Sequence, residues 1–170
     1  HMAKRLGRNR LHVYHQGDVE LIRHHGDMHL VPVINQALDQ GRFHIYAQPI
    51  CPVAPGRGGE THYEVLVRMV DEHGQLVIPD QFIPAAERYI LMPAIDRWVI
   101  TRLFQLQADN LRRWGAAHGP RQGYLFGVNL SGTSLVDDGF LSFIKRQFAD
   151  FQVPYHALCF EITETAAVAN

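Results

Sequence analysis

Alternating apolar and polar residues mark short strands along this chain, and longer runs with a helical period lie between them. Alternation predicts strands at 43–50, 61–70, 123–130 and 157–163. A period near 3.6 residues predicts helices at 18–40, 94–114 and 139–150, and a shorter helix beginning at Pro79. After the first two strands, strands and helices take turns, an order typical of a parallel sheet covered by helices.

Three of these strands carry a polar residue inside an otherwise apolar run: Glu64, Asn129 and Glu161. Because side chains alternate along a strand, we expect all three on the face that does not meet the helices, inside a barrel. Two carboxylates and an amide oxygen are a hard ligand set that suits Mg²⁺, Mn²⁺ or Ca²⁺. Each residue alone could instead be a hydrogen-bonded core residue, so that alternative stays open.

Composition narrows the classes of function. The chain has 170 residues, 46% of them hydrophobic, as expected for one globular domain. A net charge of -1 provides no basic field for a nucleic-acid polymer. No apolar stretch reaches the roughly 20 residues that cross a bilayer, so we expect no membrane contact from this segment. Two cysteines, Cys51 and Cys159, favour a reducing, cytoplasmic setting, and we expect Cys159 to be a small core residue.

Five separated motifs resemble those of the EAL domain family, in the same order along the chain. They are Gln48-Pro49-Ile50, Tyr63-Glu64-Val65-Leu66-Val67-Arg68, Pro79-Asp80-Gln81-Phe82-Ile83-Pro84-Ala85-Ala86-Glu87, Val128-Asn129-Leu130-Ser131 and Phe160-Glu161-Ile162-Thr163-Glu164-Thr165. The signature triplet reads Glu-Val-Leu here in place of Glu-Ala-Leu. Because Val65 lies on the helix-facing side of its strand, this difference changes core volume and leaves the chemistry intact.

The resemblance implies an α/β fold, a partial (β/α) barrel of the TIM type with an antiparallel first strand and about half of the barrel present. It places the N-terminal part of an EAL domain at 42–170 and a linker helix at 18–41. Residues 1–17 would hold a tag remnant, His1-Met2, and the tail of a GGDEF-like domain, which the segment 7–14 resembles. A generic basic strand is the alternative for that segment.

EAL domains are cyclic di-GMP phosphodiesterases that open one phosphodiester bond with Mg²⁺ or Mn²⁺ and release linear pGpG. By position, the resemblance assigns three metal ligands: Glu64, Asn129 and Glu161. It makes Glu64 catalytic and Arg68 a ligand of a phosphate, with Gln48 and Leu66 in contact with the dinucleotide. The structural alternative for Arg68 is an ion pair with Glu64, and for Gln48 it is a plain core or loop amide.

Later parts of the EAL pattern, including paired aspartates and a lysine, do not occur in this chain. Two functions therefore stay open. One is a cyclic di-GMP phosphodiesterase, of which this piece would be inactive alone; the other is a degenerate EAL module that binds cyclic di-GMP or a protein partner without hydrolysis. The intact Glu64 favours the first, because degenerate EAL domains often lose that glutamate. A generic α/β module with structural polar residues is a third possibility.

Half a barrel leaves the edges of its sheet and one of its faces without a partner. Exposed strand edges pair with whatever is available, because their N–H and C=O groups need hydrogen bonds. We therefore expect this chain to form a homodimer with two-fold symmetry.

Overall fold

The computed structural model describes residues 19–53, 61–118 and 124–162, and the side chains of 19–27, 114–118 and 124 are outside this description. The helices are α2 (Val19–Asp39), α3 (Pro79–Arg88), α4 (Met92–His118), α5 (Gly132–Leu135) and α6 (Phe140–Phe151). The strands are β1 (Phe43–Ile50), β2 (Thr61–Val70), β3 (Leu76–Val77), β4 (Tyr124–Leu130) and β5 (Leu158–Ile162), and a short 3-10 helix, η1 (Tyr155–Ala157), precedes β5.

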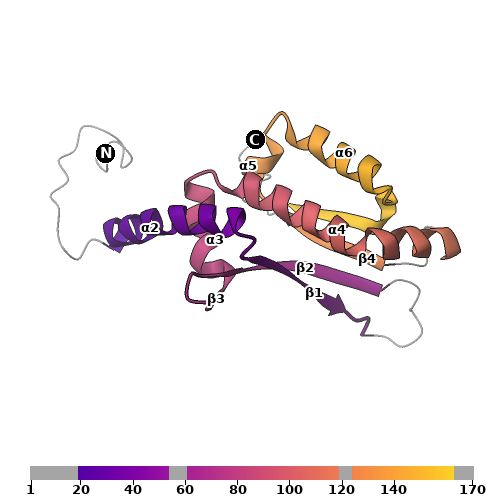
Figure 1. The fold of residues 1–170 in the computed structure, drawn as a ribbon, viewed down its shortest axis with the longest axis horizontal. Coiled ribbons are helices and arrows are strands. Elements are labelled where there is room, and N and C mark those ends of the chain that lie inside the picture. Colours follow the sequence, from indigo (N-terminus) through magenta and orange to yellow (C-terminus); the bar gives the residue numbers. More distant parts are fainter. Residues whose placement is uncertain (1–18, 54–60, 119–123, 163–170) are drawn as a thin grey trace.

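The strands form one sheet in the order β1-β2-β4-β5, with β3 paired to β2 (Figure 1). Strand β1 runs antiparallel to β2, whereas β2, β4 and β5 run parallel to one another. This arrangement confirms the predicted α/β fold with an antiparallel first strand and an open, partial barrel. The sequence did not predict β3, α5 or η1, because elements of two to four residues are too short to show a period.

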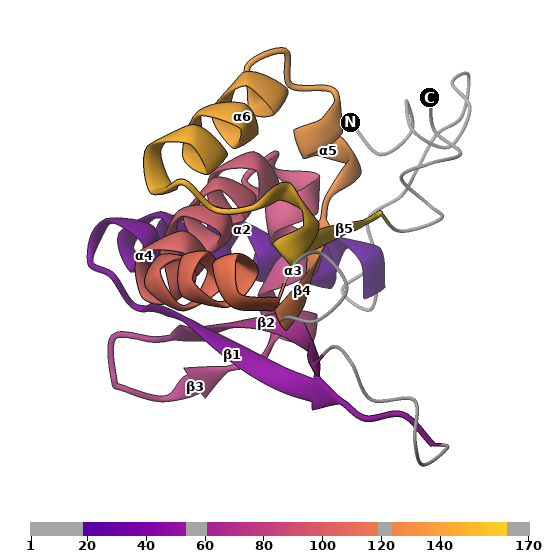
Figure 2. The same ribbon diagram turned by 90° about the vertical axis from the view of Figure 1, so that its right-hand side faces the viewer.

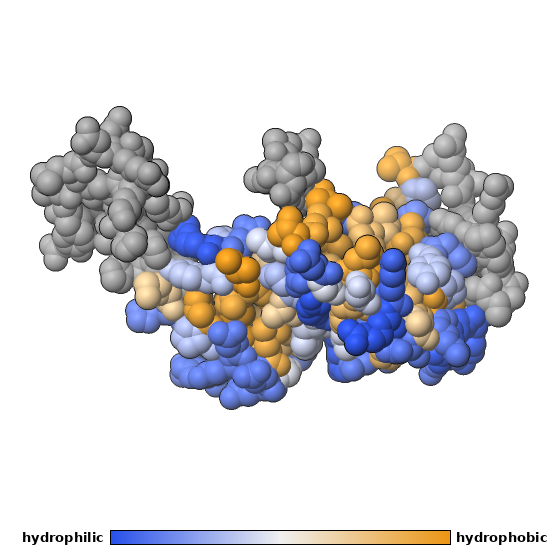
Figure 3. Space-filling model, turned by 90° about the horizontal axis from the view of Figure 1, so that it is seen from above, coloured by the Kyte–Doolittle hydropathy of each residue, from blue (hydrophilic) through white to orange (hydrophobic). Residues whose placement is uncertain are grey.

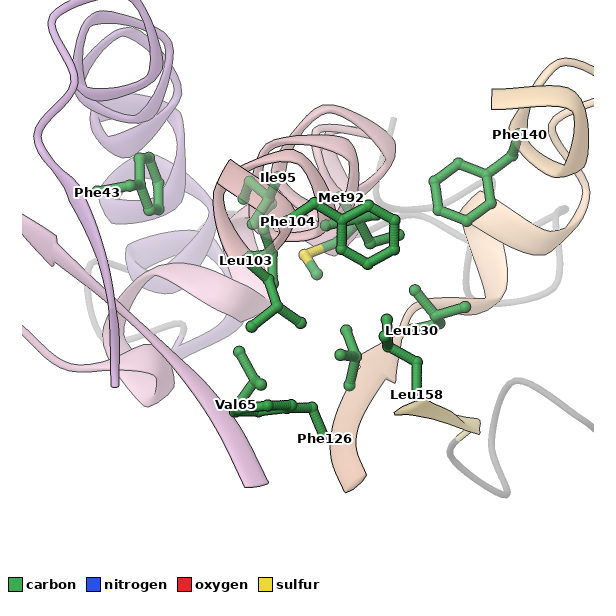
Figure 4. Close-up of a cluster of buried hydrophobic side chains, with 14 of the residues drawn as sticks. Phe43, Val65, Met92, Ile95, Leu103, Phe104, Phe126, Leu130, Phe140 and Leu158 are labelled. Carbon is green, nitrogen blue, oxygen red and sulfur yellow. The ribbon is translucent and has the colours of Figure 1, made fainter. Parts of the chain in front are cut away.

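Helices cover one face of the sheet and leave the other face open, as two perpendicular views show (Figure 1 and Figure 2). On β2, Val65 and Met69 point to the helices and are buried, and Val128 does the same on β4. Helix α4 contributes the largest share of the opposing apolar side chains, among them Ile95, Leu103 and Phe104 (Figure 4). Ile100, on the same helix, is also fully buried. The alternation of the strands therefore decides which face is core and which face is open.

Helix α2 packs its last turns against the rest of the domain. Ile34 and Ala37 are fully buried, and the helix lies against α3. Gly41, with a φ of 66°, ends the helix and turns the chain into β1, while Arg42 N–H donates to the carbonyl of Ala37. The predicted helix is therefore present, but its role as a linker stays a prediction because residues 1–17 lie outside the described ranges.

Apolar side chains reach the surface on both sides of the sheet. On the helical side the surface alternates between hydrophilic and hydrophobic areas (Figure 3), and Leu135, Val136 and Leu141 are exposed there. On the open face Tyr46 and Ile50, both in β1, are each 54% exposed. The open face is therefore not purely polar, although it carries the polar residues singled out by the sequence.

Strands β2 and β4 separate after their pairing ends at Val65 and Val128. Beyond this point β2 pairs with β3, whereas β4 continues beside β5 as far as Leu130. A cavity of about 230 Å³ lies where the strands diverge, and its walls come from both strands and from α3 and α4. The sheet is therefore split at the carboxyl end of β4.

A buried carboxylate joins α4 to the chain directly after β4. Asp96 is 4% exposed. Its Oδ2 accepts hydrogen bonds from the N–H of Ser131 at 3.0 Å, from Ser131 Oγ at 2.8 Å and from Ser134 Oγ at 2.6 Å. Burial raises the pKa of Asp96 above its ordinary value of 3.8, because desolvation outweighs these hydrogen bonds.

The turn between α3 and α4 holds a β-branched residue in the left-handed region. Ile90 has a φ of 58° and its side chain is 70% exposed. On either side of it, Tyr89 N–H donates to the carbonyl of Ala85 and Leu91 N–H donates to that of Ala86. These bonds hold the turn in a conformation that costs an L-residue about 1–2 kcal/mol.

Replacing Ile90 with glycine should therefore stabilise the domain. The relieved strain of about 1–2 kcal/mol is larger than the entropic cost of glycine in the backbone, about 0.5–1 kcal/mol, so the free energy of unfolding should rise by up to about 1.5 kcal/mol. Urea unfolding of both proteins measures this difference. Ile90→Val, which keeps the branched side chain, is the control and should change stability by less than about 0.5 kcal/mol. A glycine variant that is less stable than the wild type would show that the backbone of Ile90 is not strained.

Asp96 should make the stability of the domain depend on pH. Because folding raises its pKa, the contribution of this carboxyl is fully present below the unfolded value of 3.8 and is lost as pH rises through the folded pKa. Asp96→Asn does not titrate. The free energy of unfolding of the wild type, relative to that of Asp96→Asn, should therefore fall as pH rises above the unfolded pKa of 3.8. Urea unfolding at several pH values tests this, and a constant or rising difference would refute it.

Candidate metal and ligand site

The predicted site residues lie on neighbouring strands, on the open face of the sheet. Gln48 on β1 stands opposite Glu64 on β2, and Glu64 stands opposite Gly127 on β4. Two residues along β4, Asn129 stands opposite Glu161 on β5. Residues opposite one another in a sheet point to the same side, so four strands contribute to one surface.

Glu64, Asn129 and Glu161 converge above Gly127. Asn129 Nδ2 donates a hydrogen bond to Glu64 Oε1 at 3.1 Å. Glu161 Oε1 lies 2.8 Å from the position that a Cβ would occupy on residue 127. The side chain of Glu161 therefore leans over β4 into space that glycine leaves free. The structure thus brings the three predicted metal ligands together on neighbouring strands.

The charges in this group are only partly shielded from water. Glu64 is half-buried, whereas Asn129 and Glu161 are exposed, and neither glutamate forms an ion pair with a described residue. Among the described residues no cluster of three or more His, Cys, Asp or Glu side chains could hold a metal ion. The third donor here is instead the Asn129 amide, whose oxygen can turn toward a cation.

This donor set fits a hard divalent cation. Carboxylate and amide oxygens are the protein ligands that Mg²⁺ and Mn²⁺ prefer, and soft sulfur or imidazole ligands are absent from the group. Mg²⁺ sites commonly use one or two carboxylates and complete their coordination with water and substrate phosphates. The space above Gly127 is where the carboxylate of Glu161 can approach Glu64 from the opposite side of β4.

Arg68 lies on the same face as Glu64, four residues further along β2. Its Nη1 donates to the carbonyl of Val67 at 2.8 Å, and its guanidinium stands 5.9 Å from the centre of the Tyr46 ring. Among the described residues Arg68 forms no ion pair with Glu64, which was its structural alternative. The remaining N–H groups of the guanidinium can therefore reach an anion on the open face.

Gln48 and Leu66 extend this surface toward β1. Gln48 is exposed, and its amide makes no hydrogen bond with a described residue. Leu66 is half-buried and stands opposite Tyr46 in the antiparallel ladder. Gln48 thus places an amide beside Glu64, and Leu66 places an apolar side chain between Glu64 and Arg68 on the same face of β2.

Three residues of this face differ from, or add to, what the sequence predicted. Cys159, expected in the core, is exposed and stands opposite Gly127, because the alternation of β5 turns Leu158 inward instead. The sequence did not single out Tyr46 or Gly127. Tyr46 shares the alternation of Gln48, and a glycine inside a strand marks a close approach, so both signals were present.

Among the helices of the described residues, none combines the length and the apolar character that crossing a bilayer requires.

Comparison with known proteins identifies relatives of this chain. A family model of the EAL domain matches residues 33–170. The cyclic di-GMP phosphodiesterase PdeB of Shewanella oneidensis is 36% identical over 171 residues, which cover 99% of this chain and 19% of that protein. The cyclic di-GMP phosphodiesterase PdeF of Escherichia coli is 34% identical over 137 residues, which cover 81% of this chain and 17% of that protein. The chain therefore spans about a fifth of the length of these relatives.

Solved structures give the same match. The FimX EAL domain of Pseudomonas aeruginosa, bound to c-di-GMP, superposes with a TM-score of 0.69 and 31% identity, covering 82% of this chain and 52% of that one. The FimX EAL domain of Xanthomonas citri, at 23% identity and a TM-score of 0.67, shows the shared fold. Family model, relatives and sheet topology agree, and this chain belongs to the EAL domain family.

Proposed function

We propose that this chain supplies the first part of a metal-dependent site that hydrolyses cyclic di-GMP to pGpG. The observation that carries the proposal is the convergence of Glu64, Asn129 and Glu161 above Gly127, on the face that also bears Arg68. Relatives named cyclic di-GMP phosphodiesterases support this reaction, and the EAL structure that holds c-di-GMP supports this ligand.

Glu64, Asn129 and Glu161 would hold Mg²⁺ or Mn²⁺. A cation bound there supplies a water of lowered pKa and polarises a phosphoryl oxygen. Asn129 orients Glu64 through its 3.1 Å hydrogen bond, and its amide oxygen would be the third ligand of the cation. Glu161 brings the second negative charge, which offsets the charge of a divalent ion and strengthens its binding.

The neighbouring residues would bind the dinucleotide. The planar guanidinium of Arg68 matches the oxygens of a phosphate, and the ring of Tyr46 limits where it can move. Leu66 offers an apolar surface for a base, and the exposed amide of Gln48 can both donate to and accept from a base edge. A cytoplasmic location follows from this proposal, since the substrate is an intracellular second messenger.

Binding without hydrolysis is the second candidate. Arg68, Gln48 and Leu66 do not depend on a cation for their position, because the strand ladders hold their backbones. A dinucleotide could therefore bind to this face in a protein that does not turn it over. The intact Glu64, with Asn129 bonded to it, favours hydrolysis.

Two substitutions separate catalysis from binding in the protein that contains the whole barrel. Glu64→Gln keeps the size of the side chain but removes a charge, and should lower kcat by about 100-fold or more. Arg68→Ala removes a phosphate ligand and should mainly raise KM, by about 10- to 100-fold. Release of pGpG with Mn²⁺ measures both values.

Matched controls use the same chemical changes at exposed positions. Glu72→Gln, on the turn after β2, and Arg146→Ala, on α6, should each leave kcat and KM within about twofold of the wild type. Wild-type turnover by Glu64→Gln would refute the metal role of this residue. Cyclic di-GMP binding by the wild-type protein with no turnover would instead establish the second candidate.

We also propose that the 170-residue chain associates through its open face. The strands β1 and β5 are the edges of the described sheet, and Tyr46 and Ile50 expose apolar surface beside the first of them. Light scattering over a dilution series should show a mass approaching that of a dimer as concentration rises. Tyr46→Lys should shift this transition to higher concentration, whereas Leu141→Lys on the helical side should not.

The isolated chain should release little or no pGpG, because it covers about half of the matched EAL structure. A monomer at every concentration, or clear turnover by the chain alone, would contradict these expectations.

A further inference from the structure

The end of β4 carries Asn129 but is supported by the sheet on one side only. Pairing with β2 stops at Val128, one residue before Asn129. On the other side, β5 continues beside Asn129 and Leu130. Toward β2, the cavity of about 230 Å³ takes the place of a strand ladder. The ladder with β2 therefore ends one residue short of Asn129.

Asp96 anchors the residue that directly follows this strand. Ser131 donates both its N–H and its hydroxyl to Asp96 Oδ2, and the buried Ser134 donates a third hydrogen bond to the same oxygen. Hydrogen bonds to a carboxylate are about twice as strong as neutral ones, and a low-dielectric setting strengthens them further. The three donors thus bind the chain after β4 to one point on α4.

The position of Asp96 is itself fixed by the packing of α4. Asp96 follows Ile95, which is 1% exposed, and Ile100 on the next turn of α4 is fully buried. A helix packed in this way has little freedom to shift, because protein interiors are close-packed. Packing of the core therefore fixes the position of Asp96 relative to the sheet. The hydrogen bonds from Ser131 to Asp96 restrain Ser131 in turn.

We propose that Asp96 is a positioning residue for the metal and ligand site, because by holding Ser131 it fixes the end of β4 from which Asn129 reaches Glu64. This inference rests on the proposed function. Asp96 lies on the helical side of the sheet, away from the open face that carries Glu64 and Glu161. It acts through the backbone that joins Ser131 to Asn129, with Leu130 between them, and displacements of about 1 Å are enough to impair such sites.

A role of Asp96 in stability alone predicts a different result from a role in positioning the site. If Asp96 only stabilised the fold, its removal would lower the melting temperature and leave the affinity of the folded protein for metal unchanged. A positioning residue changes that affinity in the folded protein. Asp96→Ala removes the acceptor, whereas Asp96→Asn keeps one oxygen for Ser131 and Ser134. Ile100→Val, which truncates a buried side chain one turn further along α4, is the control for lost stability.

The experiment measures Mn²⁺ binding to the 170-residue chain by electron paramagnetic resonance, together with the melting temperature of each variant. Asp96→Ala should bind Mn²⁺ about 10-fold more weakly than the wild type. Asp96→Asn should stay within about threefold, and Ile100→Val should match the wild type in affinity despite its lower melting temperature. Wild-type affinity in Asp96→Ala would overturn the inference.

A second readout does not depend on metal. In nuclear magnetic resonance spectra, Asp96→Ala should accelerate hydrogen exchange at Ser131 N–H and shift the side-chain amide signals of Asn129, whereas Ile100→Val should do neither. If the wild type binds no Mn²⁺, the metal role in the proposed function fails, and these signals decide the inference alone. Unchanged exchange and unchanged Asn129 signals in Asp96→Ala would then overturn it, and the expected changes would support it.

Discussion

Side-chain alternation along β2 is the constraint on which the rest of the structure depends. Val65 and Met69 must face the helices because the core of the domain forms there, and this choice turns Glu64 and Arg68 to the open side. A shift of one residue in the pairing would bury both charges and expose the core residues. The free energy of apolar burial therefore fixes the placement of the polar groups, although none of them contributes to the core.

The antiparallel first strand extends that placement to the ligand surface. Because β1 runs antiparallel to β2, Gln48 stands opposite Glu64 and Tyr46 stands opposite Leu66. The side chains of the two strands therefore form one continuous surface on the open face. The parallel strands β4 and β5 then add Asn129 and Glu161 on the far side. The residues of the candidate site thus come from four strands, while each strand keeps the same simple pattern of alternation.

The sequence predicted the elements and faces that follow from local periodicity. Its alternation located the strands of Glu64, Asn129 and Glu161, and the motif order identified the fold. Periodicity could not show that Asp96 bonds to Ser131, because the two residues are far apart in the chain and meet only after packing. It also misplaced Cys159, since an apolar strand at the edge of a partial sheet buries only one of its faces. The left-handed Ile90 gave no signal, because isoleucine does not favour that conformation.

The divergence of β2 and β4 has a mechanical consequence for the site. The two strands form a wedge whose narrow end is the last paired rung, Val65 with Val128, and whose wide end opens into the cavity. Glu64 and Asn129 flank this rung, at the apex of the wedge. Glu64 lies in the paired part of β2, whereas Asn129 is the first residue of β4 beyond the last rung, so their hydrogen bond bridges the apex. A change in the angle between the two strands would therefore alter the separation of these side chains, unless the end of β4 is anchored from elsewhere.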